Sequence, residues 1–236
     1  MKIFIVNSQI NNTSKELLNC YGNIAEVAAH DMLPYAEKHH ADMQFARIDG
    51  RTLVCAPGSS CNVPLTGLNV ISGSVDLKEK YPDNIAYNIL RAGNFIFHNT
   101  KYTAPEITEL ARLKDVKIIH TKQGYAGCST ISVPLSDGSS LLVSSDKGLI
   151  DAANKLNTNE LHTEYFEDTD SIILSGYDHG FIGGCCGYDK DLGLILYGKA
   201  NGQLKSLSER YNFPIFSIYD GPITDIGGIL VMYPYL

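Results

Sequence analysis

Six polar side chains at scattered points of the chain have the types needed for chemistry at a shared site. A thiol becomes a nucleophile when a neighbouring base or cation favours its thiolate form, and a histidine or carboxylate can then carry the proton. We therefore take three of the six as catalytic candidates and three as ligand-binding candidates. The catalytic candidates are Cys128, His179 and Asp42, and the ligand-binding candidates are His40, Asn88 and Asp225.

The same residue types also have ordinary structural roles. Cys128 could be a buried, inert thiol at the start of a strand. Asp42 and Asp225 could accept hydrogen bonds from nearby amides in turns, or could hold a guanidinium or ammonium group by charge-assisted hydrogen bonds. His40 and His179 could lie exposed in loops, or could act as acid–base groups. The sequence leaves these alternatives open.

Two pairs of adjacent glycines are further ligand-binding candidates, and they also admit two interpretations. The absence of Cβ lets backbone amides approach a ligand, and it equally lets neighbouring strands approach one another. The pairs are Gly183 with Gly184 and Gly227 with Gly228.

The sequence predicts neither a metal site nor a cofactor. His39, His40 and Asp42 are neighbours, but their spacing matches no compact metal-binding signature. None of the six cysteines belongs to a C-x-x-C pair, and no secretion signal precedes them, so we expect no structural zinc and no disulfide. Gly180-x-x-Gly183 precedes no helix, as a phosphate-binding loop would require.

A repeated order of elements is expected to position the candidates: strand, hairpin, strand, helix, strand. The second strand of each unit begins near positions 51, 94, 140 and 192, at spacings of 43, 46 and 52 residues. Such spacing is typical of a repeat architecture. First strands are expected over 41–48, 85–90, 128–135 and 181–187, with several of the candidates at or near their starts. The unit that begins near position 51 has a loop in place of its helix.

Helix starts are predicted from capping patterns. Thr13 with Glu16, and Thr103 with Glu106, form capping boxes, and Asp146 precedes an amphipathic stretch. A short helix is also expected over 31–39.

The two ends of the chain together supply a fifth unit. The segment 2–28 lacks a first strand, whereas 226–232 is a first strand without a partner. Pairing the two would close a ring and remove exposed strand edges. We therefore predict a single α/β domain over 1–236, with five units around a pseudo-five-fold axis. Equivalent strand starts would then converge on one channel, where Asp42, Asn88, Cys128 and Asp225 should line one cavity.

Composition limits the partners. The net charge is −7 without a basic run, which argues against nucleic acid or an anionic membrane and favours a small cationic or neutral metabolite. No apolar stretch reaches membrane-spanning length, and 1–6 is too short for a signal peptide core, so a cytoplasmic location is expected. The oligomeric state cannot be read from the sequence.

Five stretches that together span residues 40 to 228 resemble an uncharacterised bacterial family with the guanidine-modifying-enzyme fold, or pentein fold. The stretches are HADMQ at 40–44, PDNIAYN at 82–88, KQGYAGCS at 122–129, GFIGGC at 180–185 and ITDIGG at 223–228.

The resemblance implies a pentein-like α/β propeller. It also implies chemistry by a cysteine nucleophile, a histidine and carboxylates at the channel ends of the units. In the pentein enzymes a Phe-Glu-Gly-Gly-Asp stretch matches 181–185 here, so Ile182 stands in place of the carboxylate that grips a guanidinium. Their nucleophile follows a glycine-rich run near the C-terminus, and 227–231 contains no cysteine.

Two functions follow as hypotheses. The first is a hydrolase or transferase that acts on a guanidine-, amidine- or amide-bearing metabolite, with Cys128 as nucleophile. The second is a non-catalytic pentein that binds a small molecule or a protein partner.

Overall fold

Five three-stranded sheets form the β structure of this computed structural model, which describes residues 2–235. In every sheet the middle strand pairs antiparallel with one neighbour and parallel with the other. The sheets are, in order, β15 (Leu230–Met232), β1 (Ile3–Asn7) and β2 (Asn23–Val27); β3 (Phe45–Arg47), β4 (Thr52–Cys55) and β5 (Asn69–Ser72); β6 (Leu90–Ala92), β7 (Phe95–His98) and β8 (Lys117–His120); β9 (Thr130–Pro134), β10 (Ser140–Ser144) and β11 (Leu161–Tyr165); and β12 (Cys186–Asp189), β13 (Gly193–Leu196) and β14 (Ile215–Ser217).

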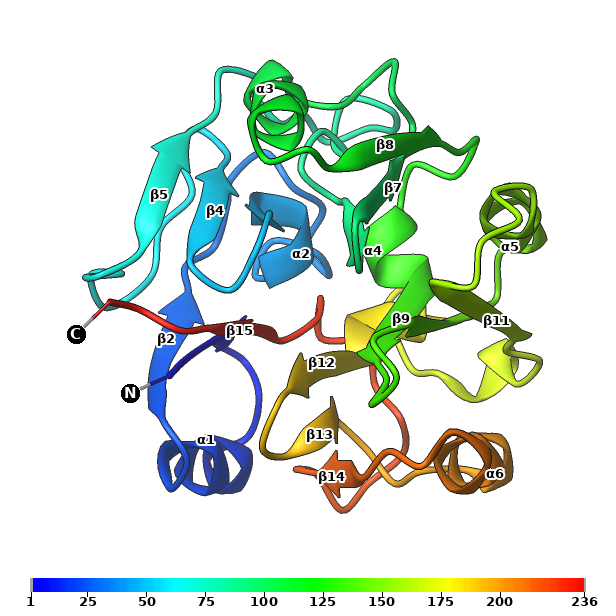
Figure 1. The fold of residues 1–236 in the computed structure, drawn as a ribbon. Coiled ribbons are helices and arrows are strands. Elements are labelled where there is room, and N and C mark those ends of the chain that lie inside the picture. The colour runs from blue at the N-terminus through cyan, green and yellow to red at the C-terminus, as the bar shows by residue number, and fades with distance from the viewer. Residues whose placement is uncertain (1, 236) are drawn as a thin grey trace.

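The molecule is therefore a mixed α/β protein built from one repeated strand unit. Figure 1 shows the sheets arranged around the middle of the molecule, with the longer helices at the periphery. The peripheral helices are α1 (Asn12–Asn19), α3 (Pro105–Leu113), α5 (Lys147–Asn154) and α6 (Gly202–Tyr211). As predicted, no helix lies between β4 and β5 in the described chain.

The predicted pairing of the terminal strands is confirmed. β15 runs antiparallel to β1, with Ile3 opposite Met232, so the last strand completes the sheet that the first strand begins. Lys2 forms two ion pairs at this junction, because its Nζ lies 2.6 Å from Asp189 Oδ1 and 2.9 Å from Asp191 Oδ2. The hydroxyl of Tyr233 donates a hydrogen bond of 2.9 Å to the other oxygen of Asp189.

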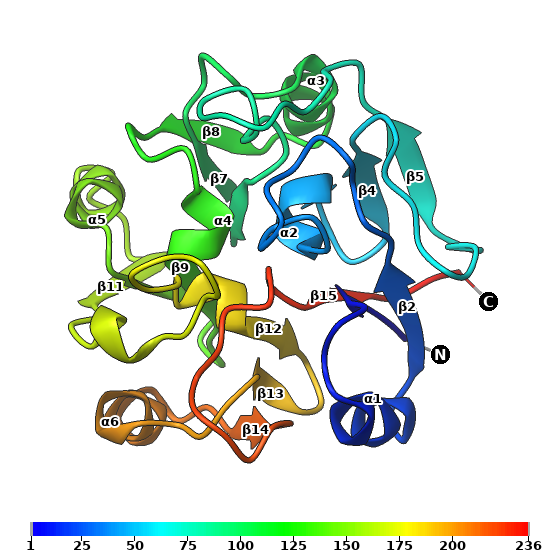
Figure 2. The same ribbon diagram turned by 180° about the vertical axis from the view of Figure 1, so that it is seen from behind.

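The first strands are shorter than predicted. Short helical turns replace their expected starts: α2 (Ala41–Gln44) precedes β3, α4 (Ala126–Ser129) precedes β9, and the 3-10 turn η2 (Gly183–Cys185) precedes β12. These turns surround the middle of the molecule in the view from behind (Figure 2). A short apolar run cannot distinguish one helical turn from a strand by periodicity alone, which explains the error.

Two capping predictions were also wrong by one or two residues. Helix α1 is capped by Asn11, whose side chain accepts from Ser14 N, rather than by Thr13. Helix α3 begins after Ala104, and the Thr103 hydroxyl instead lies 2.7 Å from His98 Nδ1. Asp146 does cap α5, as predicted.

The segment 31–39 forms turns rather than the predicted helix. It matters for the site, because it carries Glu37 to the middle of the molecule, as described below. No described helix is long and apolar enough to cross a lipid bilayer.

Candidate functional site

Cys128, Asp42 and Asn88 form one buried cluster, although three different units supply them. The thiol of Cys128 in α4 donates a hydrogen bond of 3.0 Å to Asp42 Oδ2 in α2. Asn88, in the turn before β6, donates from Nδ2 to the Cys128 sulfur at 2.9 Å and to the backbone oxygen of Asp42 at 3.1 Å. Its Oδ1 accepts from the backbone N–H of Gly127 at 2.9 Å. Asn88 thus fixes the thiol and the carboxylate relative to each other.

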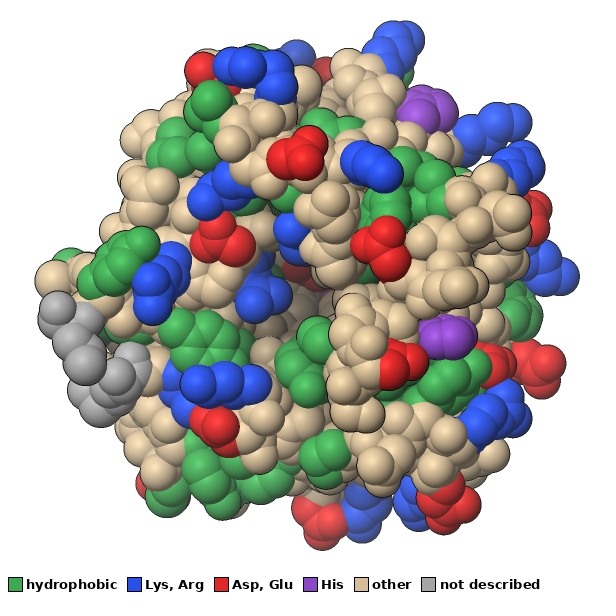
Figure 3. Space-filling model, in the orientation of Figure 1, with side chains coloured by type: hydrophobic (Ala, Val, Ile, Leu, Met, Phe, Trp, Pro, Cys, Tyr) green, Lys and Arg blue, Asp and Glu red, His purple; other side chains and the backbone are tan. Residues whose placement is uncertain are grey.

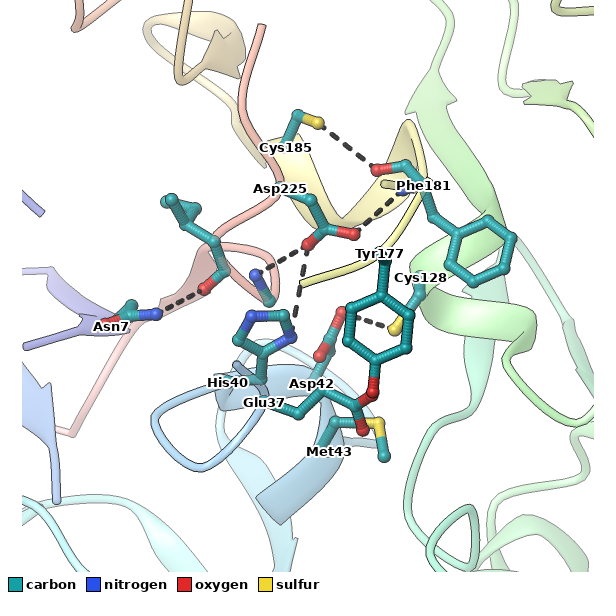
Figure 4. Close-up of polar contacts among 12 residues, drawn as sticks. Asn7, Glu37, His40, Asp42, Met43, Cys128, Tyr177, Phe181, Cys185 and Asp225 are labelled. Carbon is teal, nitrogen blue, oxygen red and sulfur yellow. Dashed lines mark hydrogen bonds and ion pairs between the residues drawn. The ribbon is translucent and has the colours of Figure 1, made fainter. Parts of the chain in front are cut away.

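Asp225 lies beside this cluster and organises the loops around it. Its Oδ2 accepts from the backbone N–H of Phe181 at 2.8 Å, and its Oδ1 accepts from Gly227 N at 3.0 Å. His40 Nδ1 is 4.0 Å from Oδ1 of the same carboxylate. Figure 4 shows His40, Asp42 and Asp225 facing one another, with Cys128 next to Asp42. Asp225 therefore has the amide-bonding role that the sequence left open.

A cavity of about 440 Å³ opens beside the cluster, and Cys128, His40 and Asp225 line it. We call it the acidic cavity, because its lining contains four carboxylates and no lysine or arginine. The carboxylates belong to Glu37, Glu79, Asp178 and Asp225. Such a lining attracts cations, in agreement with the sign of the net charge.

Two side-chain oxygens in the wall of the acidic cavity are buried without a hydrogen-bond partner among the described residues. They are Oε2 of Glu37 and Oδ1 of Asn84. Leaving an acceptor buried and unpaired costs about 1–3 kcal/mol, more when it is charged. A ligand with several N–H donors would satisfy both oxygens.

Aromatic rings make up much of the remaining wall. The ring centroids of Tyr81 and Tyr125 are 5.7 Å apart, and those of Tyr125 and Phe181 are 6.0 Å apart. The Tyr177 hydroxyl donates a hydrogen bond to Glu37 Oε1 across the cavity (Figure 4). Aromatic faces beside carboxylates suit a planar or bulky cation, which gains from both the ring quadrupole and the charge.

Burial controls the protonation of the cluster. Burial raises the pKa of Asp42 to about 6, His40 opposes that rise, and the Asp225 carboxylate adds to it. Burial also raises the pKa of the Cys128 thiol well above its ordinary value, and the Asp42 and Asp225 carboxylates raise it further. At neutral pH the cluster therefore rests as a thiol hydrogen-bonded to a carboxylate, rather than as a thiolate.

The exposed-loop interpretation is wrong for His40, which is buried beside Asp225, whereas His179 is a half-buried loop residue. His179 lines the acidic cavity, but the hydrogen bond of its Nδ1 is to the backbone oxygen of Gly180 at 3.0 Å, and nothing in residues 2–235 bonds it to Cys128. His39 lies 2.8 Å from the Ser8 hydroxyl and 3.2 Å from Val27 O, away from His40. Within the described chain no group of three or more His, Cys, Asp or Glu is placed to hold a metal ion.

Three of the four glycines in the two pairs allow close packing. A Cβ atom on Gly184 would lie 2.1 Å from Asp225 Oδ1, and one on Gly183 would lie 2.2 Å from Gly127 O. Gly227 has a φ of +76°, and its Cβ would lie 2.2 Å from the Cβ of His40. The amides of the second pair are already used, since Gly227 N donates to Asp225 and Gly228 N donates to Gly184 O at 2.7 Å. The steric interpretation therefore accounts for Gly183, Gly184 and Gly227. Gly228 is different, because a Cβ there would come no closer than 3.5 Å to Asp42, and its φ of +75° is what favours glycine.

Sequence reasoning missed the residues that loops bring to the acidic cavity: Glu37, Asn84, Tyr125 and Tyr177. Asn84 and Tyr125 lie inside two of the stretches that carry the resemblance above, which was an available signal. Glu37 lies in the predicted helix over 31–39 and Tyr177 in a segment without a regular pattern, and no sequence signal marks either as a site residue.

Comparison with known proteins gives a family match without an activity. A model described as a family of unknown function (DUF6873) matches residues 5–230, which includes every residue of the cluster and of the acidic cavity. No curated protein matches the chain.

Proposed function

The chain belongs to the family of unknown function DUF6873, and from its site we propose that it is a pentein-like enzyme. Its substrate would be a small metabolite that carries a guanidinium or amidinium group, and Cys128 would be the nucleophile. The observation that carries the proposal is the Cys128 thiol, hydrogen-bonded to the Asp42 carboxylate at the wall of the acidic cavity.

The repeated fold supports the pentein part of the proposal. Five sheets share one strand order, and the two chain ends pair to complete one of them. This matches five units in a ring, the arrangement expected of a pentein-like propeller. The three residues that make up the cluster precede first strands of successive units, as channel-end residues of that fold would.

The acidic cavity supports the substrate class. A planar cation with several N–H groups matches the unpaired oxygens of Glu37 and Asn84, and its charge offsets the surrounding carboxylates. A flat cation also packs against the tyrosine rings. An anionic substrate would face four carboxylates without a compensating lysine or arginine.

The proposed thiol step uses Asp42 as the proton acceptor. The Cys128 proton passes to Asp42 Oδ2 while sulfur attacks the amidinium carbon and forms a C–S bond. Asp42 then returns the proton to the departing nitrogen as the C–N bond breaks, which releases ammonia or an amine. In a hydrolase, water attacks the resulting S-linked carbon, breaks the C–S bond and restores the thiol; in a transferase, an acceptor amine does so. A pKa of about 6 suits Asp42 to move a proton in both directions near neutral pH.

A bound cation would also activate the thiol. The Cys128 thiol resists ionisation because it is buried beside two carboxylates. A positive charge next to sulfur lowers the cost of the thiolate form, so the nucleophile forms only when the substrate is present.

The experiment compares two alkylating reagents of nearly equal size, cationic 2-chloroacetamidine and neutral 2-chloroacetamide. We expect the cationic reagent to label Cys128 at least tenfold faster than the neutral one at pH 7.5, because the acidic cavity concentrates cations (an estimate of about 1.4 kcal/mol). Peptide mass spectrometry reports all six cysteines at once, so buried Cys185 and exposed Cys20 serve as internal controls. Equal labelling of Cys128 by both reagents would contradict the proposal.

Turnover is then assayed as ammonia release from simple guanidines and amidines. Cys128→Ala and Asp42→Asn should abolish it, whereas Cys185→Ala, outside the cavity, should not.

The second candidate function is a non-catalytic binding protein for the same cations, and the high pKa of the Cys128 thiol favours it. In that case guanidines would bind with the same affinity to the native protein and to Cys128→Ala, and no ammonia would appear.

A further inference from the structure

A second, smaller cavity has Asp42 in its wall, whereas Cys128 is not among its lining residues. Its volume is about 120 Å³, and Asp42, Arg47, Arg91, Ser132, Tyr188 and Gly228 are among its lining residues. We call it the arginine pocket. Figure 3 shows the face of the molecule hollowed at its centre, with Lys or Arg side chains beside the hollow. Asp42 lines this pocket, and its hydrogen bond to Cys128 links the pocket to a residue in the wall of the acidic cavity.

Arg47 enters the arginine pocket without a counterion. Its Nε is buried and has no hydrogen-bond partner, and no carboxylate of the described chain lies within 4.0 Å of its guanidinium. The nearby carboxylate of Asp49 is engaged instead by Lys114 at 2.8 Å. Arg47 as a whole is half-buried, but its Nε–H donor has lost water and gained nothing in exchange, which is costly.

Arg91 adds a second positive charge to the same pocket. Its Nε donates to Ile48 O at 3.0 Å, and its Nη1 donates to Phe95 O at 3.1 Å, so part of its guanidinium is held in place by backbone carbonyls. Burial lowers the pKa of Arg91, and the positive charge of Arg47 lowers it further, because like charges repel each other. A bound anion would remove this repulsion.

Asp42 supplies a group of opposite sign in the same pocket. Its Oδ2 is occupied by the Cys128 thiol, whereas its Oδ1 is buried and has no hydrogen-bond partner. Two residues around this small volume therefore carry a buried atom without a partner among the described residues: a donor on Arg47 and an acceptor on Asp42.

We propose that the arginine pocket is a binding site for a small carboxylate that also carries a hydrogen-bond donor. The carboxylate would pair with Arg47 and Arg91, whose planar guanidinium groups match its two oxygens. The donor, a hydroxyl or an ammonium group, would pair with Asp42 Oδ1. The volume of about 120 Å³ restricts the ligand to a few heavy atoms, such as those of a short amino acid or hydroxy acid.

The test measures binding of three carboxylates to the full-length protein by calorimetry at fixed ionic strength. Glycine carries an ammonium donor, glycolate carries a hydroxyl donor, and acetate carries neither. We expect glycine or glycolate to bind at least about tenfold more tightly than acetate, because only they satisfy Asp42 Oδ1. Acetate binding as tightly as both others would overturn the role of Asp42. Absence of binding by all three would overturn the site.

Variants separate the pocket from general charge effects. Arg47→Gln should weaken binding of the best ligand by about tenfold or more, whereas Arg51→Gln should leave it unchanged, because Arg51 is exposed and lies outside the pocket. Arg47→Lys retains the charge without the planar fork and should also weaken binding, which provides a second test if Arg47→Gln folds poorly. Equal binding by native protein and a folded Arg47→Gln or Arg47→Lys variant would refute the proposal. None of these measurements depends on turnover at Cys128, so the outcome is independent of the enzymatic proposal above.

Discussion

Cys128 and Asp42 are 86 residues apart in sequence, and the thiol of the first donates a hydrogen bond of 3.0 Å to the carboxylate of the second. Both side chains are buried, and each lies on a single helical turn that precedes the first strand of its unit. A thiol and a carboxylate in this contact share one proton, so the charge of either depends on the other.

The pH dependence of stability should reveal the protonation of Asp42. Burial raises its pKa from an ordinary value of 3.8 to about 6 in the folded protein. A raised carboxyl pKa stabilises the folded state fully below about pH 4, and this stabilisation is lost as the pH rises through about 6. The loss amounts to roughly 3 kcal/mol.

Asp42→Asn removes this titration. Relative to the native protein, its free energy of unfolding should therefore increase by about 3 kcal/mol between pH 4 and pH 8, measured by urea denaturation. Asp178→Asn is the control, because Asp178 borders the same cavity but is exposed. A constant difference between native protein and Asp42→Asn across this pH range would show that Asp42 is not perturbed.

The two ion pairs of Lys2 at the junction of the chain ends should contribute unequally to stability, because one carboxylate partner is buried and the other is exposed. Lys2 binds two carboxylates, but the side chain of Asp189 is 0% exposed and that of Asp191 is 61% exposed. Asp189→Ala should lower the free energy of unfolding by about 2–4 kcal/mol, because it leaves Lys2 and Tyr233 without a buried acceptor. Asp191→Ala should cost no more than about 1 kcal/mol. Similar losses in both variants, measured by chemical denaturation, would contradict this account.

Removal of the last strand should unfold the protein. Deleting 226–236 strips β15 from β1, exposes a strand edge and takes Val231 and Met232 out of the core. It also removes Ile226, which is buried in the core. We expect no cooperative transition in a thermal melt of the truncated chain, whereas a chain that lacks only Tyr235 and Leu236 should melt like the native protein. A folded 1–225 fragment would show that the terminal pairing is dispensable.

Guanidinium binding should depend on Glu37 more than on Glu79. Both carboxylates line the acidic cavity, but Glu37 is buried with one unpaired oxygen and Glu79 is exposed. Glu37→Gln should weaken binding of methylguanidine by about tenfold or more, and Glu79→Gln should change it less than about threefold, since exposed charges are screened. Calorimetric titration measures both. A larger effect at Glu79 would place the cation elsewhere in the cavity.

The sequence by itself determined the repeat. Apolar runs, turn residues and helix patterns recur at a nearly constant spacing, and this is a local property that needs no coordinates to detect. The half-units at the two ends then required the pairing of β15 with β1, because an unpaired strand edge is unfavourable. The positions of Cys128, Asp42, Asn88 and Asp225 near the starts of repeated units followed from the same spacing.

Only the tertiary structure decided how those residues meet. Whether a segment before a strand forms a helical turn depends on contacts with other units, such as the hydrogen bond from Asp42 N to Gly227 O. The loops that bring Glu37 and Tyr177 to the acidic cavity have no periodic pattern, so their paths depend on packing between distant segments. The raised pKa of Cys128 arises from burial beside two carboxylates that other units supply. The burial of a residue and the charges around it depend on segments from the whole fold, so they cannot be read from the local sequence around that residue.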